Sequence, residues 1–220
     1  DIGVKAFEKI IYAMVLLCRR TMDKATSCPE NCKRFHSAGS FETILKSVST
    51  FCLLSEEDTS KAVSEYGAKW ALWFIAVTAS DNEDRQKSWA EAVPLLIKVL
   101  ETHGKSAEVA EMGCRAARNI SMEEENASAL VSEGIAECIN KLMKTHRGNG
   151  AVSESIAWAL VNLSCSENIA TILGAHGCCV IVADALVECL TSTTTAISSS
   201  SSSEGAEDKN GMETLMNART

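Results

Sequence analysis

The chain has 220 residues, of which 46% are hydrophobic and 23% are charged, so most of it is expected to fold rather than stay disordered. Its 29 acidic and 21 basic residues give a net charge of −8, which argues against a protein that binds nucleic acid by neutralising phosphates. No apolar run approaches the about 18 residues that a membrane-spanning helix needs, so no membrane insertion is expected.

Apolar residues at helical spacing predict helices along most of the chain. In chain order these are expected at about Val4–Arg20, Asn126–Glu133, Ile135–Thr145 and Ala151–Cys165, and the helical pattern ends near Leu190. Beyond it, 191–220 is a Ser- and Thr-rich low-complexity linker followed by a polar tail, which cannot form a core of its own.

The chain repeats itself at a fixed interval. A shift of 43 residues superposes Val109 on Val152 and Asn119 on Asn162, and a longer shift of 88 residues places Trp70-Ala71-Leu72 on Trp158-Ala159-Leu160. Each unit is interpreted as a short first helix, a second helix and a longer third helix, with a sharp corner between the first two. The corners of successive units are expected at Gly39, Glu91, Gly134 and Gly177.

These repeats predict the organisation of the chain. A solenoid is expected over 1–190, composed of a partial unit (1–25), three units at about 29–80, 82–122 and 124–166, and a truncated unit at 167–190. The first full unit is longer than the other two, and its extra residues are placed at 55–60. One unit cannot bury its apolar face alone, so the units are expected to stack into an all-α rod with one continuous core.

The third helices carry a second face besides the one that packs into the core. A step of about 100° per residue from Val152 places the apolar residues on one stripe and Glu154, Trp158 and Asn162 on another. Equivalent helices stack side by side, so rows of such residues are predicted. The rows are Tyr12, Trp70, Arg115 and Trp158; Leu16, Phe74, Asn119 and Asn162; and Glu8, Tyr66, Glu111 and Glu154.

Two segments resemble the armadillo-repeat family, to which importin-alpha and beta-catenin belong. Residues 91–100 (EAVPLLIKVL) are similar to its second-helix pattern G-A-I-P-x-L-V-x-L-L, with Glu91 in place of Gly. Residues 154–164 (ESIAWALVNLS) are similar to its third-helix pattern E-x-x-x-W-A-L-x-N-L. The resemblance covers about Val4 to Leu190 and implies a right-handed α–α superhelix of about four repeats plus a partial N-terminal repeat.

In that family the third helices line a concave groove, where Asn side chains hydrogen-bond the backbone of an extended peptide and Trp side chains flank its pockets. The resemblance carries these roles to Trp158 and Asn162, where the motif is complete. Asn119 matches only the amide position, because Arg115 replaces the Trp. Trp70 matches only the aromatic position, because Phe74 replaces the Asn.

The leading hypothesis is therefore a non-catalytic module that binds an extended segment of another protein, with basic residues of that segment facing Glu111 and Glu154. Arg115 is placed between Trp70 and Trp158, where it could stack on them. The predicted peptide-binding residues are Trp158, Asn162, Glu154, Asn119, Arg115, Glu111, Trp70, Phe74 and Tyr66. The alternatives are a structural segment of a larger scaffold without a peptide groove and an importin-like transport adaptor. Self-association is left open.

No enzymatic activity, cofactor or metal is expected. Cys28, Cys32 and His36 offer three zinc ligands at close spacing, but a fourth is not evident. Cys178 and Cys179 could be reactive thiols, or they could be helix residues that follow the corner at Gly177. The ten Cys residues are interpreted as reduced thiols, which favours a cytoplasmic or nuclear protein.

Overall fold

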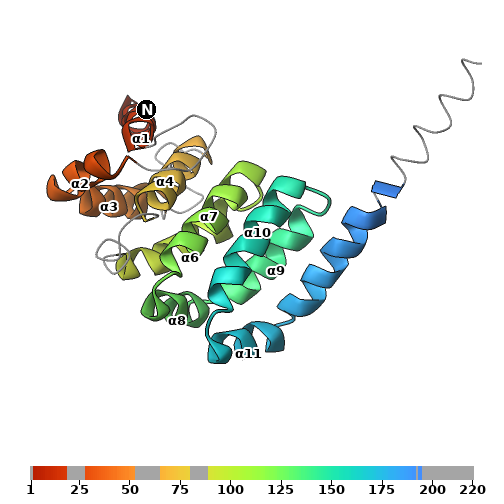
Figure 1. Cartoon of the computed structure of the whole chain (residues 1–220). Coiled ribbons are helices and arrows are strands. Elements are labelled where there is room, and N and C mark those ends of the chain that lie inside the picture. The colour runs from red at the N-terminus through yellow and green to blue at the C-terminus, as the bar shows by residue number, and fades with distance from the viewer. Residues whose placement is uncertain (1, 19–27, 53–64, 80–88, 192, 195–220) are drawn as a thin grey trace, which may run out of the picture.

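The structure is a computed structural model that describes residues 2–18, 28–52, 65–79, 89–191 and 193–194 (Figure 1). The predicted insertion at 55–60 and nearly all of the predicted tail lie outside these residues. Every secondary-structure element that the structure describes is a helix. The helices are α1 (Ile2–Cys18), α2 (Pro29–Ser37), α3 (Ser40–Cys52), α4 (Glu65–Thr78), η2 (Ala90–Ala92), α6 (Val93–His103), α7 (Ala107–Ile120), α8 (Glu124–Ser132), α9 (Ile135–Thr145), α10 (Gly150–Leu163), α11 (Glu167–Ala175) and a last helix, Cys178–Thr191.

The repeating unit has three helices, as the sequence predicts, and α8, α9 and α10 form one complete unit. The corner between its first two helices is Gly134, which has φ 90°. Gly39 and Gly177 form the same corner in other units, with φ 66° and 84°. Glycine suits these positions because side chains with a Cβ rarely adopt positive φ. The fourth predicted corner, Glu91, lies within the short helix η2 instead.

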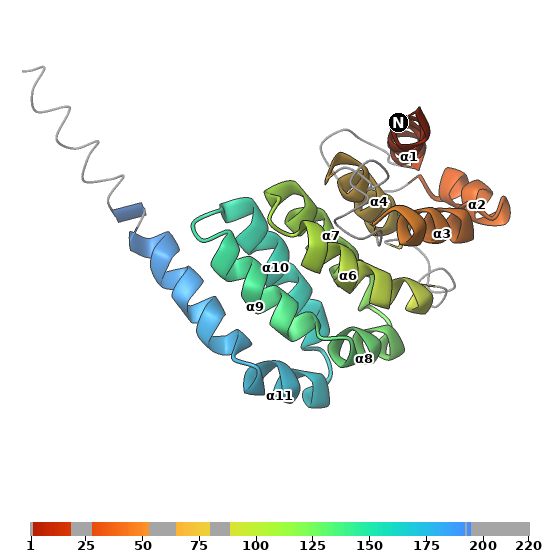
Figure 2. The ribbon, with the colours of Figure 1, turned by 180° about the vertical axis from the view of Figure 1, so that it is seen from behind.

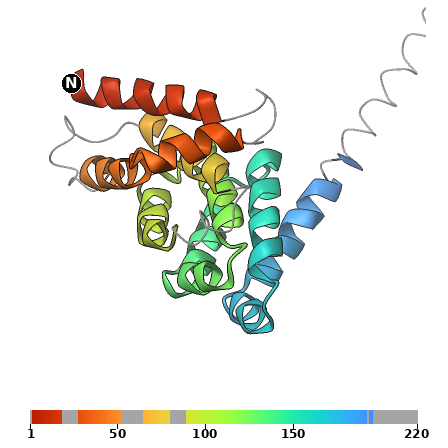
Figure 3. The same cartoon turned by 60° about the vertical axis from the view of Figure 1, so that its left-hand side comes forward.

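The units stack so that their third helices lie side by side. Helix α4 packs between α1 and α7, and α7 packs between α4 and α10. Figure 1 shows α4, α7 and α10 in one layer, and the view from behind in Figure 2 shows α6 and α9 in the layer that covers them. Figure 3 shows α1 at one end of the stack and the last helix at the other. The all-α repeat solenoid is confirmed.

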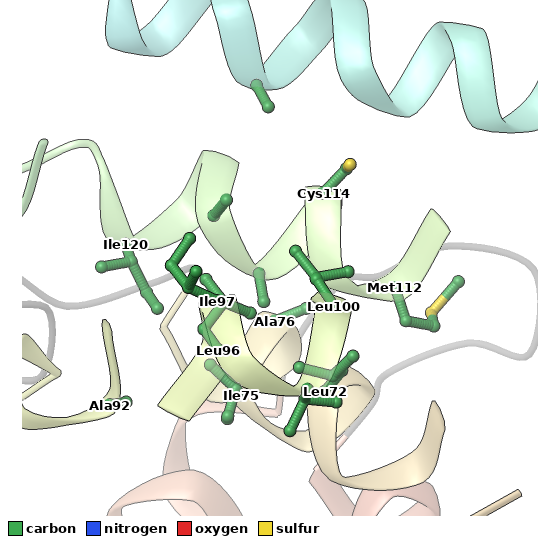
Figure 4. Packing of buried hydrophobic residues seen from close by; sticks show 14 of the residues in the cluster. Leu72, Ile75, Ala76, Ala92, Leu96, Ile97, Leu100, Met112, Cys114 and Ile120 are labelled. Carbon is green, nitrogen blue, oxygen red and sulfur yellow. The ribbon is translucent and has the colours of Figure 1, made fainter. Parts of the chain in front are cut away.

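The core runs continuously through the stack. In its middle, Leu72 of α4, Leu100 of α6 and Ile120 of α7 are buried among the packed helices (Figure 4). A Cβ at Gly113 would lie 2.3 Å from Leu100 Cδ2, so α6 and α7 approach closely because this position has no side chain. Burial of such side chains is the main favourable contribution to the stability of each unit.

Polar side chains also tie consecutive units together. The ring of His146 is buried, and its Nε2 donates to the carbonyl oxygen of Gly104 at 2.6 Å. In α8, the buried Asn126 donates through Nδ2 to the carbonyl oxygen of Ile120 at 3.2 Å, at the end of the preceding third helix. Such bonds satisfy backbone carbonyls that a helix end leaves without an intrahelical partner.

No single described helix is long and apolar enough to cross a membrane. Helix α11 and the last helix meet the length and composition criteria only together, as a pair bent by 72°.

Candidate functional site

The stacking register of the third helices determines which side chains share a surface. Asn119 Nδ2 donates to the carbonyl oxygen of Ala76 at 2.6 Å, and Asn162 Nδ2 donates to that of Arg118 at 2.9 Å. The two bonds are equivalent when the helices are aligned by their last residues. The structural step is therefore 42 residues from α4 to α7 and 43 residues from α7 to α10.

Helix α1 is the third helix of the partial N-terminal unit. Another pair of equivalent contacts aligns it with α4. Lys9 Nζ lies 5.7 Å from the centre of the Tyr66 ring, and Lys69 Nζ lies 2.6 Å from a carboxylate oxygen of Glu108. In each case a lysine near the start of one third helix reaches the first turn of the next third helix. This alignment also pairs the buried residues Ile11, Val15 and Cys18 with the buried residues Ile156, Leu160 and Leu163.

The surface defined by this register is named here the third-helix face. It consists of three rows of equivalent positions on α1, α4, α7 and α10. The rows are Lys9, Lys69, Glu111 and Glu154; Ala13, Trp73, Arg115 and Trp158; and Leu17, Val77, Asn119 and Asn162. All of these side chains are at least partly exposed except that of Val77, which is buried.

Three of the predicted binding residues, Tyr66, Trp70 and Phe74, are not in these rows. Trp70 is only 6% exposed and Phe74 only 2%, so the prediction that their side chains face a groove is wrong. Trp73, three residues later, occupies the position equivalent to Trp158. On α1, the equivalent positions are Ala13 and Leu17, each one residue after the predicted Tyr12 and Leu16.

Trp70 instead anchors an aromatic cluster between α1 and α4. Its ring lies 4.4 Å from that of Tyr12 and 5.6 Å from that of Tyr66, and it stacks on Trp73 at 4.9 Å. Tyr66 is partly exposed beside this cluster, in the first turn of α4. The buried ring of Phe74 contacts Phe35 of α2.

The N-terminal half of the face, which α1 and α4 form, is cationic as well as aromatic. Lys69 Nζ lies 5.2 Å from the centre of the Trp70 ring in addition to its ion pair with Glu108. Lys9 is exposed above Tyr66. Two ammonium groups therefore lie beside aromatic rings at this end of the stack.

The C-terminal half carries acidic, amide and guanidinium groups. Glu111 pairs with Arg115 on the same helix at 2.7 Å, and Glu154 is exposed. Trp158 is 45% exposed, and the Arg118 guanidinium lies 4.6 Å from the centre of its ring. Arg115 lies between Trp73, rather than Trp70, and Trp158 in its row, and the guanidinium on the Trp158 ring is that of Arg118.

Arg118 and Trp73 are the residues of this site that the sequence did not predict. The spacing of the family-like motif gave no signal for either. Arg118 directly precedes Asn119, on a helix position that the motif leaves unspecified. The apolar stretch 70–77 gave no signal for Trp73 either, and only the structure shows that Lys69 and Trp73 are the partly exposed side chains within the otherwise buried stretch 67–79.

Several cysteines, including the candidate Cys178, lie in the core. Burial raises the pKa of the Cys114 thiol, and it raises the pKa of Cys138 to about 12, so both are un-ionised at neutral pH. Burial also raises the pKa of Cys178, the residue after the Gly177 corner, whereas Cys179 is exposed.

The possible zinc ligands lie in different environments. Cys32 is buried and its thiol donates to the carbonyl oxygen of Cys18, whereas His36 is exposed on α2. Within the part of the chain that the structure describes, no group of three or more His, Cys, Asp or Glu residues is arranged to hold a metal ion.

Among solved structures, the fold is similar to a designed armadillo repeat protein, YIII(Dq.V1)4CPAF, in complex with the peptide (KR)4. The match has a TM-score of 0.63 at 22% sequence identity, and it covers 84% of this chain and 67% of that chain. No family model matches the chain, and no curated protein matches it. The likeness shows that this chain has an armadillo-like helical repeat fold.

Proposed function

We propose that the chain is a non-catalytic module that binds an extended, basic segment of another protein along the third-helix face of α7 and α10. The observation that carries this proposal is the partly exposed Trp158 indole, which lies on the same helix as Glu154 and Asn162 and holds a guanidinium on its ring. A designed protein with a similar fold has been solved in complex with the basic peptide (KR)4, which supports a basic peptide as the ligand.

The two asparagines suit recognition of a peptide backbone. A primary amide has two N–H donors and an acceptor oxygen, and the bonds to Ala76 and Arg118 each use one N–H. These bonds also fix the orientation of the amides before a ligand arrives. A pre-oriented amide satisfies the polar groups of an extended backbone at a small loss of side-chain entropy.

The charges favour a cationic ligand. Glu154 is exposed one helical turn before Trp158, so an incoming Lys or Arg side chain can lie on the indole while its head group pairs with the carboxylate. Arg118 already shows that a guanidinium is accommodated on this ring. A ligand side chain would take the place of Arg118 or lie on the remaining exposed part of the indole.

The row that contains Asn119 and Asn162 limits how far such a groove extends. Val77 and Leu17 occupy the amide positions on α4 and α1, so amide recognition is confined to α7 and α10. This favours a short peptide-binding site over the long row of Trp and Asn pairs that the importin-like alternative requires. It leaves the N-terminal half of the face for the structural role of the scaffold alternative.

The test is a fluorescence-anisotropy titration of labelled (KR)4, the peptide named with the designed protein. Wild-type protein is expected to bind it, and Trp158→Ala and Glu154→Gln are each expected to weaken binding about three- to tenfold. Met122→Ala is the matched control, because Met122 is exposed on the turn after α7. Affinity that is unchanged in both face variants would exclude this face as the binding site.

A further inference from the structure

The joint between α1 and α2 is built on the last carbonyl groups of α1. Cys18 ends this helix, and its carbonyl oxygen accepts a hydrogen bond from the backbone N–H of Cys28, the residue before α2. The carbonyl oxygen of Leu17 accepts from Nδ2 of Asn31 at 2.8 Å. These bonds satisfy groups that a helix end leaves without an intrahelical partner, so the end of α1 is fixed against the start of α2.

This joint brings three cysteines together. The carbonyl oxygen of Cys18 also accepts from the thiol of Cys32 at 3.7 Å, so Cys18, Cys28 and Cys32 meet at one oxygen atom. Residues joined by backbone hydrogen bonds between adjacent segments have Cα atoms about 5.5 Å apart. A disulfide needs a Cα separation of about 4.4–6.8 Å, so Cys18 and Cys28 are close enough to form one.

The three cysteines differ in exposure and in their fit to one another. Cys28 is partly exposed, whereas Cys18 and Cys32 are buried, so an oxidant dissolved in water reaches Cys28 first. Cys32 is the poorer partner for Cys28, because its backbone N–H donates to the Cys28 carbonyl oxygen at 3.0 Å, one helical turn away. At that spacing Cβ atoms lie about 5–6 Å apart, beyond the about 3.5–4.5 Å of a disulfide.

We propose that Cys28 and Cys18 form a reversible disulfide in response to peroxides. Hydrogen peroxide transfers one oxygen atom to the Cys28 thiol, which becomes a sulfenic acid, and one water is released. The sulfur of Cys18 then attacks the sulfenic sulfur, the S–S bond forms, and the sulfenic oxygen leaves as a second water. The two thiols lose two electrons in total, and these electrons reduce the peroxide. A dithiol reductant reverses the reaction by thiol–disulfide exchange.

The disulfide staples α1 to the unit that follows it. Helix α1 packs on α4, where the Tyr12 ring lies 4.4 Å from that of Trp70, and its residue Val15 is buried in the shared core. A bridge from Cys18 to Cys28 closes a short loop and lowers the conformational entropy of the unfolded chain. Oxidation is therefore expected to stabilise the folded chain and to hold α1 in its place beside α4.

Peptide mapping of the full chain tests the proposal, after treatment with hydrogen peroxide and alkylation of the remaining thiols. Trypsin combined with a protease that cleaves after glutamate separates the three cysteines, because Lys24 and Glu30 flank Cys28. Peptide 10–19 is expected to be linked to peptide 25–30, and dithiothreitol is expected to release it. Cys28 that is alkylated or oxidised to sulfinic acid, with no such link, contradicts the proposal. A link from peptide 10–19 to Cys32 contradicts it as well.

Urea unfolding with matched variants gives a second readout. Oxidation is expected to raise the unfolding midpoint of the wild type by about 1 M urea. Cys28→Ser is expected to show neither the link nor the shift, although it keeps the backbone N–H that bonds Cys18. Cys165→Ser removes an exposed cysteine elsewhere and is expected to keep both. A shift that persists in Cys28→Ser would assign the effect to other thiols and overturn the proposal.

Discussion

The Trp158 indole is held by a guanidinium from the neighbouring unit, at the place where a cationic ligand side chain would bind. Arg118 is partly buried against this ring, 4.6 Å from its centre. Under the proposed function it acts as an internal competitor. Its removal frees one side of the indole and also takes a positive charge away from the site.

We therefore expect Arg118→Ala to bind (KR)4 more tightly than wild type, by about two- to fivefold, since an exposed cation–π contact contributes about 0.5–1 kcal/mol. The same anisotropy titration measures this. Arg147→Ala is the matched control, because Arg147 is an exposed arginine that pairs with Glu188 away from the third-helix face. Weaker binding by Arg118→Ala would mean that this guanidinium contacts the ligand rather than competing with it.

His103, at the end of α6, links the stability of the fold to pH. Burial lowers its pKa from 6.5, against an opposing effect of the Glu65 carboxylate. The folded chain thus binds this proton less readily than the unfolded chain. Stability is therefore expected to fall as the pH drops below about 6.5, and to be unaffected by this group at higher pH.

Urea unfolding at several pH values measures this contribution. The decrease in unfolding free energy between neutral and acidic pH should be smaller in His103→Gln than in wild type. An equal decrease in the two proteins would show that other groups determine the acid sensitivity.

At the level of the elements, the buried side chain of His146 ties the connection after α9 to the preceding unit. The carbonyl oxygen of Gly104 can only accept, so His146 Nε2 carries the proton in this bond. His146→Phe keeps a ring of similar size but leaves a buried carbonyl without this donor. We expect it to cost about 1–3 kcal/mol in urea unfolding, and His36→Phe, at an exposed histidine, to cost much less. An equal, small effect of both would mean that water satisfies the Gly104 carbonyl.

The sequence predicted helices best where turn chemistry bounds a clear amphipathic pattern. The predicted Ile135–Thr145 coincides with α9, between the Gly134 corner and a loop that contains glycines. The register of α4 was not predictable in the same way. Its residues 70–77 are apolar all round, so neither periodicity nor the Trp70-Ala71-Leu72 match distinguishes two alignments that differ by three residues, or nearly one turn.

That three-residue difference determines which tryptophan belongs to the candidate site. Trp70 is buried because Tyr12 and Tyr66 from two helices close around it, which is a tertiary effect that a single repeat pattern does not contain. Trp158, Asn162 and Glu154 share one exposed stripe of α10, as the periodicity predicts, because the polar residues of this helix fix its orientation. Arg118 was missed because its role depends on the adjacent unit.

At the scale of the whole molecule, the net charge of −8 and the acidic groups near Trp158 predict that binding of a basic peptide depends on salt. Raising NaCl from about 50 mM to about 500 mM shortens the Debye length and is expected to weaken (KR)4 binding several-fold. An uncharged Gly-Ser peptide of the same length serves as the control. Binding that does not respond to salt would indicate that apolar contacts, rather than Glu154 and its neighbours, determine affinity.

The central claim is that the third-helix face around Trp158 receives the peptide, and the four indole N–H groups of the chain report on it directly. In a 1H–15N NMR titration with (KR)4, the Trp158 signal, assigned with Trp158→Phe, is expected to move progressively to saturation. The Trp89 signal is expected to stay fixed, because that ring is buried against Phe41. A Trp158 signal that does not move while the peptide binds would contradict this account.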